Sequence, residues 1–187
     1  MTTIAAIQGS TWAVVGYDSQ VSEDNGRKYT LPKDSGKCFA VGEYLIGVAG
    51  DLRAVNILSY IFRPPDPAGK NSVIELDKFM NSKFVPALKR CFDENYYGKD
   101  GEHGSELLVV VNSTIYEIGG NYDCMRDTNG LYAIGSGGDY ALGALSAQDL
   151  GARRTIKVSQ DSIHTAITIA SKYDAATSDP ITTITKK

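Results

Sequence analysis

Short apolar runs separated by turn residues are the dominant pattern of this chain. An early pair, residues 3–8 and 12–17, flanks a Gly-Ser-Thr break, and a later pair, residues 37–41 and 44–49, flanks Gly42. Short apolar runs bounded by turn residues are typical of β-strands joined by hairpins. The predicted strands are residues 3–8, 12–17, 37–41, 44–49, 107–111, 114–118, 131–134 and 181–185.

Two segments in the middle of the chain carry apolar residues at helical spacing. The first follows Asp51, a residue suited to the N-cap, and ends at the proline run after Arg63. The second opens with Ser72 and Glu75, which fit a capping box. Pro86 lies inside the second segment and predicts a kink or a break there.

Two further helices are predicted in the last third of the chain. One covers residues 140–148, and the other begins at Ser159 or Asp161 and ends near Tyr173. The polar stretch 19–36 is expected to be a loop or short strands.

The order of these elements places pairs of helices between groups of strands. It indicates an α+β fold in which helices pack on antiparallel sheets. Two arrangements are open at this point: two sheets between two helical layers, or one sheet with helices on one face. The length of 187 residues predicts a single domain, residues 1–187.

Composition excludes several classes of function. A net charge of −3 offers no basic footprint for nucleic acid. No apolar run is long enough to span a bilayer, and the start of the chain lacks the features of a signal peptide. We therefore expect a cytoplasmic protein that binds neither nucleic acid nor membrane.

The cysteines and histidines do not suggest a metal site or a disulfide framework. Cys38, Cys91 and Cys124 are odd in number and widely spaced, and only His103 and His164 could join them as ligands. We predict no metal and no cofactor. Cys38 lies in an apolar run and is expected to be a buried thiol, and both histidines are expected at the surface.

The first residues carry candidate chemistry of a different kind. If Met1 is removed, Thr2 presents a hydroxyl and a free α-amine on the same residue. An α-amine has an unperturbed pKa of roughly 7.7–8.0, so it is suited to act as the base for the hydroxyl nucleophile. A start of Met-Thr is also common in proteins without such chemistry.

A glycine-rich turn, residues 135–138, follows a predicted strand and precedes a predicted helix. Backbone N–H groups in such a turn can hold an anion at a helix N-terminus. The stretch lacks the Lys-Ser/Thr of a phosphate loop and the full dinucleotide fingerprint, so, taken alone, it is better explained as a tight turn that needs glycine.

Five stretches resemble, in this order, the β-type subunits of proteasomes, and most of all the HslV-type peptidase of bacteria. They are residues 2–4, 16–20, 36–37, 45–51 and 133–145. The resemblance implies a four-layer αββα sandwich of the N-terminal nucleophile hydrolases, with two antiparallel sheets between two helical layers. It implies a threonine-type endopeptidase subunit that forms an acyl-enzyme on its N-terminal threonine.

The resemblance also assigns site residues. It makes Thr2 the nucleophile and Lys37, held charged by Asp18, the cation beside it, although without the family pattern these two residues could be an ordinary ion pair. The remaining assignments are the Gly47 N–H as oxyanion donor, Ser136 near the N-terminal amine, and Asp174 with Thr177 as supporting residues.

Two departures from the family pattern affect these assignments. Asp18 and Lys37 are further apart in sequence than the pattern suggests, which makes Lys33 a competing active-site lysine. A pair of glycines usual after the Asp174 element is replaced by residues 178–180, Ser-Asp-Pro. A specificity pocket lined by Val21, Leu45 and Ala49 is expected to favour apolar side chains before the cleaved bond.

The resemblance implies partners as well. Protein or peptide substrates, a homo-oligomeric ring of six- or seven-fold symmetry that can be stacked, and a separate ATP-dependent unfoldase would be expected. Two other functions remain open: a non-catalytic shell subunit on the same fold, and an amidase that acts on a small molecule.

Overall fold

The predicted strands are all present, each within one residue of its expected ends. The computed structural model describes residues 2–23, 25–32, 35–70, 72–151 and 154–187. The strands are β1 (Ile4–Gln8), β2 (Ala13–Asp18), β3 (Gln20–Ser22), β4 (Lys28–Thr30), β5 (Cys38–Val41), β6 (Tyr44–Ala49), β7 (Glu106–Val111), β8 (Thr114–Ile118), β9 (Cys124–Met125), β10 (Leu131–Ile134) and β11 (Ile181–Lys186). Only the two-residue β9 lies in a stretch for which neither strand nor loop was predicted.

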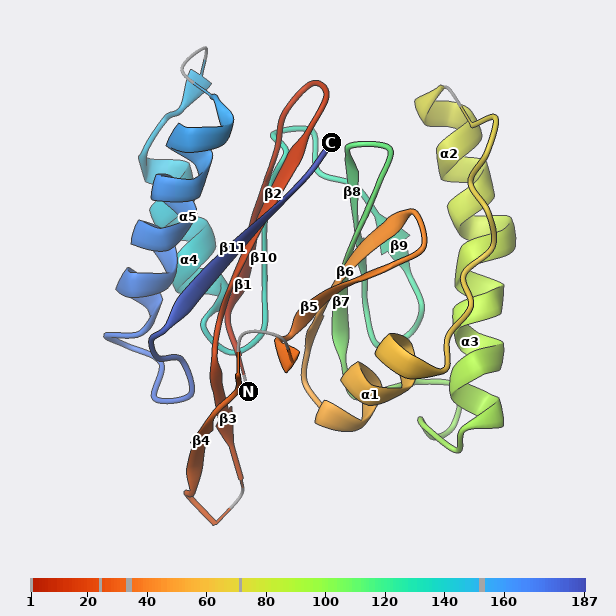
Figure 1. The fold of residues 1–187 in the computed structure, drawn as a ribbon, viewed down its shortest axis with the longest axis horizontal. Helices are drawn as coiled ribbons and strands as arrows, with labels where there is room; N and C mark the ends of the chain where they lie inside the picture. Colours follow the sequence, from red (N-terminus) through yellow and green to blue (C-terminus); the bar gives the residue numbers. More distant parts are fainter. Residues whose placement is uncertain (1, 24, 33–34, 71, 152–153) are drawn as a thin grey trace.

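The strands form two larger antiparallel sheets and one small ribbon. One sheet has the order β10-β1-β2-β11, and the other has the order β5-β6-β7-β8-β9. Strands β3 and β4 pair with each other and project from the body of the molecule as a two-stranded ribbon (Figure 1).

The helices cover the outer faces of both sheets. They are α1 (Leu52–Tyr60), α2 (Val73–Phe79), the π-helical segment η2 (Met80–Phe84), α3 (Val85–Glu94), α4 (Gly138–Ala147) and α5 (Ile156–Ala170). Helices α4 and α5 lie against the sheet that contains β1, and α1 to α3 lie against the other sheet (Figure 1). Of the two arrangements left open by the element order, the structure therefore has the four-layer αββα sandwich.

Alternation along each central strand explains why these strands are apolar throughout. Ile4 and Ala6 of β1 face the core between the sheets, whereas Ala5 and Ile7 face α4 and α5. Because successive side chains point to opposite faces, a strand covered on both sides needs apolar residues at every position.

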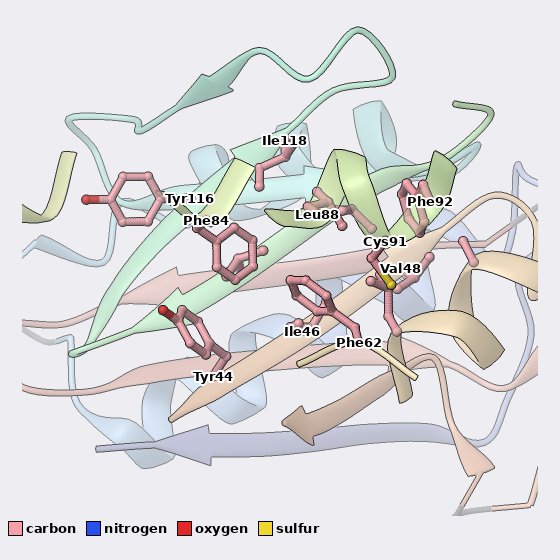
Figure 2. Close-up of a cluster of buried hydrophobic side chains, with 14 of the residues drawn as sticks. Tyr44, Ile46, Val48, Phe62, Phe84, Leu88, Cys91, Phe92, Tyr116 and Ile118 are labelled. Atoms are coloured by element: carbon pink, nitrogen blue, oxygen red, sulfur yellow. The ribbon is translucent and has the colours of Figure 1, made fainter. Parts of the chain in front are cut away.

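The core beneath α1 to α3 is the most aromatic part of the molecule. Phe84 is fully buried there, and its ring lies 4.9 Å from that of Tyr44 and 5.6 Å from that of Phe62 (Figure 2). The Phe62 and Phe84 rings meet edge to face, a favourable geometry for aromatic pairs.

The predicted caps of the two middle helices are confirmed. Asp51 accepts a hydrogen bond from the Arg53 N–H at 2.8 Å, and α1 ends at Tyr60, before the proline run. Ser72 and Glu75 form both bonds of the capping box.

Pro86 neither breaks its helix nor stands in its interior. The chain runs from α2 through the π-helical segment into α3, and Pro86 lies in the first turn of α3. Proline is tolerated in a first turn, and π-helical turns are one way in which a helix absorbs an irregularity.

The predicted start of the last helix is wrong. Thr155, rather than Ser159 or Asp161, is the N-cap, and its hydroxyl accepts from the Val158 N–H at 3.3 Å. Ile156 and Val158 pack against the core beneath α4 and α5, so burial of these residues extends the helix by one turn toward the N-terminus.

The two histidines differ from each other. His164 is exposed on α5 as expected, but His103 is only 5% exposed, so the prediction of a surface position for His103 is wrong. Cys38 is buried as predicted. None of the helices within the described ranges has the length and apolar character needed to cross a bilayer.

We predict that Phe84→Ala lowers the free energy of unfolding by about 3–5 kcal/mol, because it removes a buried ring and leaves a cavity. Tyr60→Ala is the matched control, since Tyr60 is 71% exposed on the same side of the molecule, and its effect should stay within about 0.5 kcal/mol. Urea denaturation followed by circular dichroism measures both values. Equal effects of the two substitutions would contradict this description of the core.

Candidate active site

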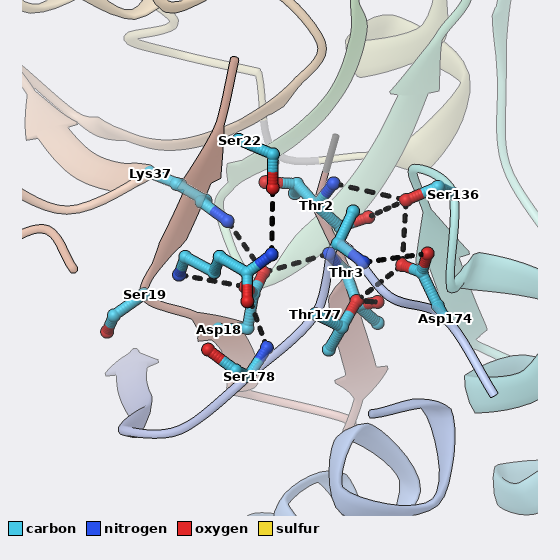
Figure 3. A network of polar contacts seen from close by, with 12 residues as sticks. Thr2, Thr3, Asp18, Ser19, Ser22, Lys37, Ser136, Asp174, Thr177 and Ser178 are labelled. Atoms are coloured by element: carbon cyan, nitrogen blue, oxygen red, sulfur yellow. Dashed lines mark hydrogen bonds and ion pairs between the residues drawn. The ribbon is translucent and has the colours of Figure 1, made fainter. Parts of the chain in front are cut away.

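Thr2 lies two residues before β1, where its backbone is held by residues 136–137, a segment distant in sequence. Its side chain is only 3% exposed. The Thr2 N–H donates to Ser136 Oγ at 3.3 Å, and the Thr2 carbonyl accepts from the Gly137 N–H at 3.5 Å (Figure 3). The next residue, Thr3, donates its N–H to Asp18 at 2.9 Å.

Asp18 and Lys37 form a buried ion pair near Thr2. Lys37 Nζ lies 2.7 Å from Asp18 Oδ1, and the two side chains are 4% and 0% exposed. Burial lowers the pKa of Lys37, and the neighbouring Asp18 carboxylate opposes that shift. Lys33, the competing lysine, lies outside the described residues.

Asp18 also holds the backbone around it. Besides Lys37, its carboxylate accepts hydrogen bonds from the N–H groups of Thr3, Gln20 and Ser178. These donors come from the N-terminus, the start of the β3–β4 ribbon and the entry to β11 (Figure 3). A carboxylate with this many donors is fixed in position, and so is the lysine beside it.

On the other side of Thr2, Ser136, Asp174 and Thr177 form a connected network. Ser136 Oγ donates to Asp174 Oδ2 at 2.7 Å, and Thr177 Oγ1 donates to the same oxygen at 2.6 Å. Thr177 Oγ1 also bonds to the Thr3 hydroxyl. Burial by itself would raise the pKa of Asp174, but these two bonds and one from the Ala176 N–H lower it below its usual value.

Two glycines allow the 135–138 turn to approach Thr2 and Thr3. Gly135 has φ +88°, and a Cβ there would overlap the Thr2 carbonyl oxygen. A Cβ on Gly137 would overlap the Thr3 hydroxyl. This turn therefore needs glycine for close backbone approach, and it places the Ser136 hydroxyl at the Thr2 nitrogen.

A cavity of about 780 Å³ opens beside Thr2. It is lined by Thr2, Val21, Ser22, Glu23, Gly26, Lys28, Lys37, Val48, Gly50, Asp51, Leu52, Val55, Asp174, Ala175 and Ala176. Of the residues predicted for the specificity pocket, Val21 lines this cavity. Leu45 and Ala49 instead pack in the core between the sheets, because their side chains point to the opposite face of β6 from Val48.

The structure does not bring Gly47 to the cavity. Gly47 lies inside β6, opposite Cys38 of β5 and Leu108 of β7, and a Cβ there would lie 2.9 Å from Cys38 Sγ and 3.3 Å from Ile4 Cγ2. Gly50, at the end of the same strand, lines the cavity together with Thr2. The signal in the sequence that could have identified Gly50 is its position after the apolar run, directly before the helix cap Asp51.

Within the described ranges, no group of three or more His, Cys, Asp or Glu side chains is placed to bind a metal ion.

This architecture has a defined class. Two antiparallel sheets between two helical layers form the αββα fold of the solved HslV-like structures. The expectation of that fold is confirmed.

Several solved structures resemble the chain, whereas no protein-family model matches the sequence. BPH from Thiobacillus denitrificans, in complex with epoxomicin, has a TM-score of 0.77 and 19% identity over 98% of this chain and 97% of that chain. HslV from Trypanosoma brucei has a TM-score of 0.67 and 19% identity over 98% of both chains. Anbu, an ancestral β-subunit from Yersinia bercovieri, has a TM-score of 0.69 and 12% identity over 98% of this chain and 81% of that one.

We predict that Asp18→Asn destabilises the protein by about 3–5 kcal/mol, because it leaves the buried Lys37 ammonium without its counter-charge. Adding Lys37→Met should restore part of the loss. Asp161→Asn is the control, since Asp161 and its partner Lys157 are exposed, and it should cost less than about 1 kcal/mol. Chemical denaturation tests this series. A double variant no more stable than Asp18→Asn would show that the buried charge is not the cause.

Proposed function

We propose that this chain is a threonine-type endopeptidase subunit that cleaves peptide bonds through an acyl-enzyme on Thr2. The observation that carries the proposal is the setting of Thr2. It lines a cavity with Lys37, whose ammonium is paired with Asp18, and its nitrogen contacts Ser136 on the opposite side. Met1 lies outside the described residues, and its removal is part of the proposal, because only then does Thr2 carry a free amine.

In the first half of the reaction, Thr2 Oγ1 attacks the carbonyl carbon of the peptide bond. Its proton passes to the Thr2 α-amine, directly or through a water. The tetrahedral intermediate collapses when the C–N bond breaks and the leaving amine takes up that proton. The acyl part of the substrate stays on Thr2 as an ester.

In the second half, water adds to the ester carbonyl, and the α-amine accepts a proton from that water. Collapse of the second tetrahedral intermediate breaks the ester bond, releases the carboxylic acid product and returns the proton to Thr2 Oγ1. No cofactor is required, since each proton released in one step is used in the next.

Lys37 lowers the cost of charge on Thr2 Oγ1 during attack, and Asp18 keeps Lys37 protonated against the effect of burial. Ser136 holds the amine in reach of the hydroxyl, and Asp174 with Thr177 fixes the direction of the Ser136 hydroxyl. These roles account for the network on each side of Thr2.

We propose Gly50, in place of Gly47, as the backbone donor for the oxyanion. Val48 donates its N–H to the Lys37 carbonyl at 2.9 Å. Alternate N–H groups of a strand point to the same side, so the N–H two residues later is directed past the end of β5, toward the cavity that Gly50 lines with Thr2. An oxyanion donor must reach the position where negative charge develops, which the paired interior of β6 does not offer.

The proposal includes assembly and location. We propose a homo-oligomeric ring of six- or seven-fold symmetry, single or stacked, that works in the cytoplasm on protein or peptide substrates. An ATP-dependent unfoldase would be a separate chain, because this sequence has no nucleotide-binding motif of its own.

We expect an epoxyketone, which reacts with a hydroxyl beside a free amine, to add once to a chain that has lost Met1. Intact-mass spectrometry reads both changes, and Thr2→Ala should abolish the adduct while leaving the fold intact by circular dichroism. Thr165→Ala on α5 is the matched control and should keep the adduct. A chain that keeps Met1 and takes no adduct under any condition would point to a shell subunit, and an adduct on a monomer by light scattering would favour an amidase.

We expect peptides with a large apolar residue before the cleaved bond to be the best substrates, because Val21, Val48 and Val55 line the cavity. Val21→Phe narrows that cavity and should reduce kcat/KM for a phenylalanine substrate by about tenfold, with little effect for alanine. A fluorogenic peptide panel measures the ratio, and the alanine peptide is the internal control. Preferred cleavage after acidic residues would contradict this pocket.

A further inference from the structure

A single segment, residues 103–106, supports both arms of the candidate active site. Ser105 Oγ accepts a hydrogen bond from the Asp51 N–H at 3.3 Å, next to Gly50. The Glu106 carboxylate accepts from the Gly135 N–H at 2.7 Å, next to Ser136. The segment therefore touches the backbone on the oxyanion side and on the amine side of Thr2.

Gly50 lies in close contact with the backbone of Gly104 and Ser105. Gly50 has φ +121°, and a Cβ there would lie 2.5 Å from the Gly104 carbonyl oxygen and 2.9 Å from Ser105 Cα. Only glycine allows this approach, so the position of the Gly50 backbone follows the position of the 103–106 segment.

His103 anchors this segment from behind. Its ring Nδ1 accepts a hydrogen bond from the Ser105 N–H at 3.3 Å, and its backbone N–H donates to the Gly120 carbonyl at 2.8 Å. The Ser105 hydroxyl is held in addition by the Tyr97 hydroxyl at 2.7 Å. Within the described part of the chain, the buried Nε2 atom of His103 has no hydrogen-bond partner.

We propose that neutral His103 is a positioning residue, which holds Ser105 and through it the Gly50–Asp51 backbone, and that protonation of its imidazole releases this hold. For catalysis, the inference rests on the proposed function. As a statement about the backbone at Gly50 and Asp51, it stands by itself.

Protonation would release Ser105 because it changes which ring nitrogens can accept a hydrogen bond. A neutral imidazole accepts through Nδ1, but the protonated ring has donors at both nitrogens. The Ser105 N–H would then face another donor, and the imidazole ring would carry a positive charge among aromatic rings. Both changes oppose the present position of the 103–106 segment.

The surroundings of His103 are uncharged at close range. Phe92 of α3, Tyr97 and Tyr122 surround the ring, with centroids 5.1, 6.4 and 4.6 Å away. The titratable and charged groups nearby on the packed elements are Tyr97, Tyr122, Asp51, Lys89, Asp93, Glu102 and Glu106. Lys89 and Asp93 pair with each other on the exposed face of α3.

Burial lowers the pKa of His103 below its ordinary value of 6.5. A histidine with a lowered folded pKa binds fewer protons than the unfolded chain between the two values. Its contribution to stability is therefore complete above the unfolded value and is lost as the pH falls through the folded value. The hold on Ser105 should be present at neutral pH and lost as the pH falls through the folded pKa of His103.

Hydrogen–deuterium exchange of the full chain, read by mass spectrometry, tests the inference without any need for catalysis. Exchange at the imidazole Cε1–H gives the pKa of His103, and backbone exchange gives the protection of residues 50 and 51. We expect that protection to fall about five-fold as the pH passes below the measured pKa, the effect of losing one ordinary hydrogen bond. If protection is unchanged across that pKa, or if His103 stays neutral until the fold is lost, the inference is overturned.

His103→Asn places a non-titrating acceptor near the position of Nδ1. In this variant the protection of residues 50 and 51 should therefore show no step with pH, whereas wild type should show one. His164→Asn is the matched control, because His164 is the only other histidine and lies exposed on α5, and it should behave as wild type. Tyr97→Phe keeps the imidazole and should lower protection at every pH without moving the midpoint. A step that persists in His103→Asn would exclude His103 as its origin.

The rate of Thr2 adduct formation with the epoxyketone connects the inference to function. The adduct rate of wild type divided by that of His103→Asn should decline as the pH falls below the His103 pKa. A wild-type chain without adduct at any pH refutes the proposed function but leaves the exchange result to decide the inference. An adduct rate whose ratio does not change with pH refutes the link between His103 and the site.

Discussion

The Asp18 carboxylate is the interaction on which the candidate active site depends. It is fully buried, and its donors are the Lys37 ammonium and the N–H groups of Thr3, Gln20 and Ser178. A buried charge is tolerated only when it is paired and hydrogen-bonded. The same donors that satisfy Asp18 therefore fix the N-terminus, the ribbon, the start of β5 and the entry to β11 around one point.

Backbone proximity is the second constraint. Gly135 and Gly137 let one turn lie directly on Thr2 and Thr3, and Gly50 lets the end of β6 lie under Gly104. Side chains at these positions would push apart segments that meet only in the folded state. The site is thus built where strand ends from both sheets converge and where the backbone itself supplies donors.

Much of the fold could be predicted because local patterns and tertiary packing agree. Residues of β1 and β6 are buried on both faces, which requires the uninterrupted apolar runs that the sequence displays. The start of α5 could not be predicted, because contacts of Ile156 and Val158 with the core favour Thr155 over the equally good caps that follow. Local propensity cannot rank caps that differ only in the burial of the residues between them.

By itself, the sequence determined the strand and helix order, the caps at Asp51 and Ser72, and the candidates Thr2, Asp18, Lys37, Ser136, Asp174 and Thr177, because short-range patterns and family motifs carry that information. The tertiary structure alone decided which face of each strand borders the cavity: Val21 does, and Leu45 and Ala49 do not. It also placed Gly50, and not Gly47, in the lining of the cavity, and it buried His103. The physical reason is that a side chain's surroundings depend on register and on contacts between segments far apart in sequence, which no local pattern records.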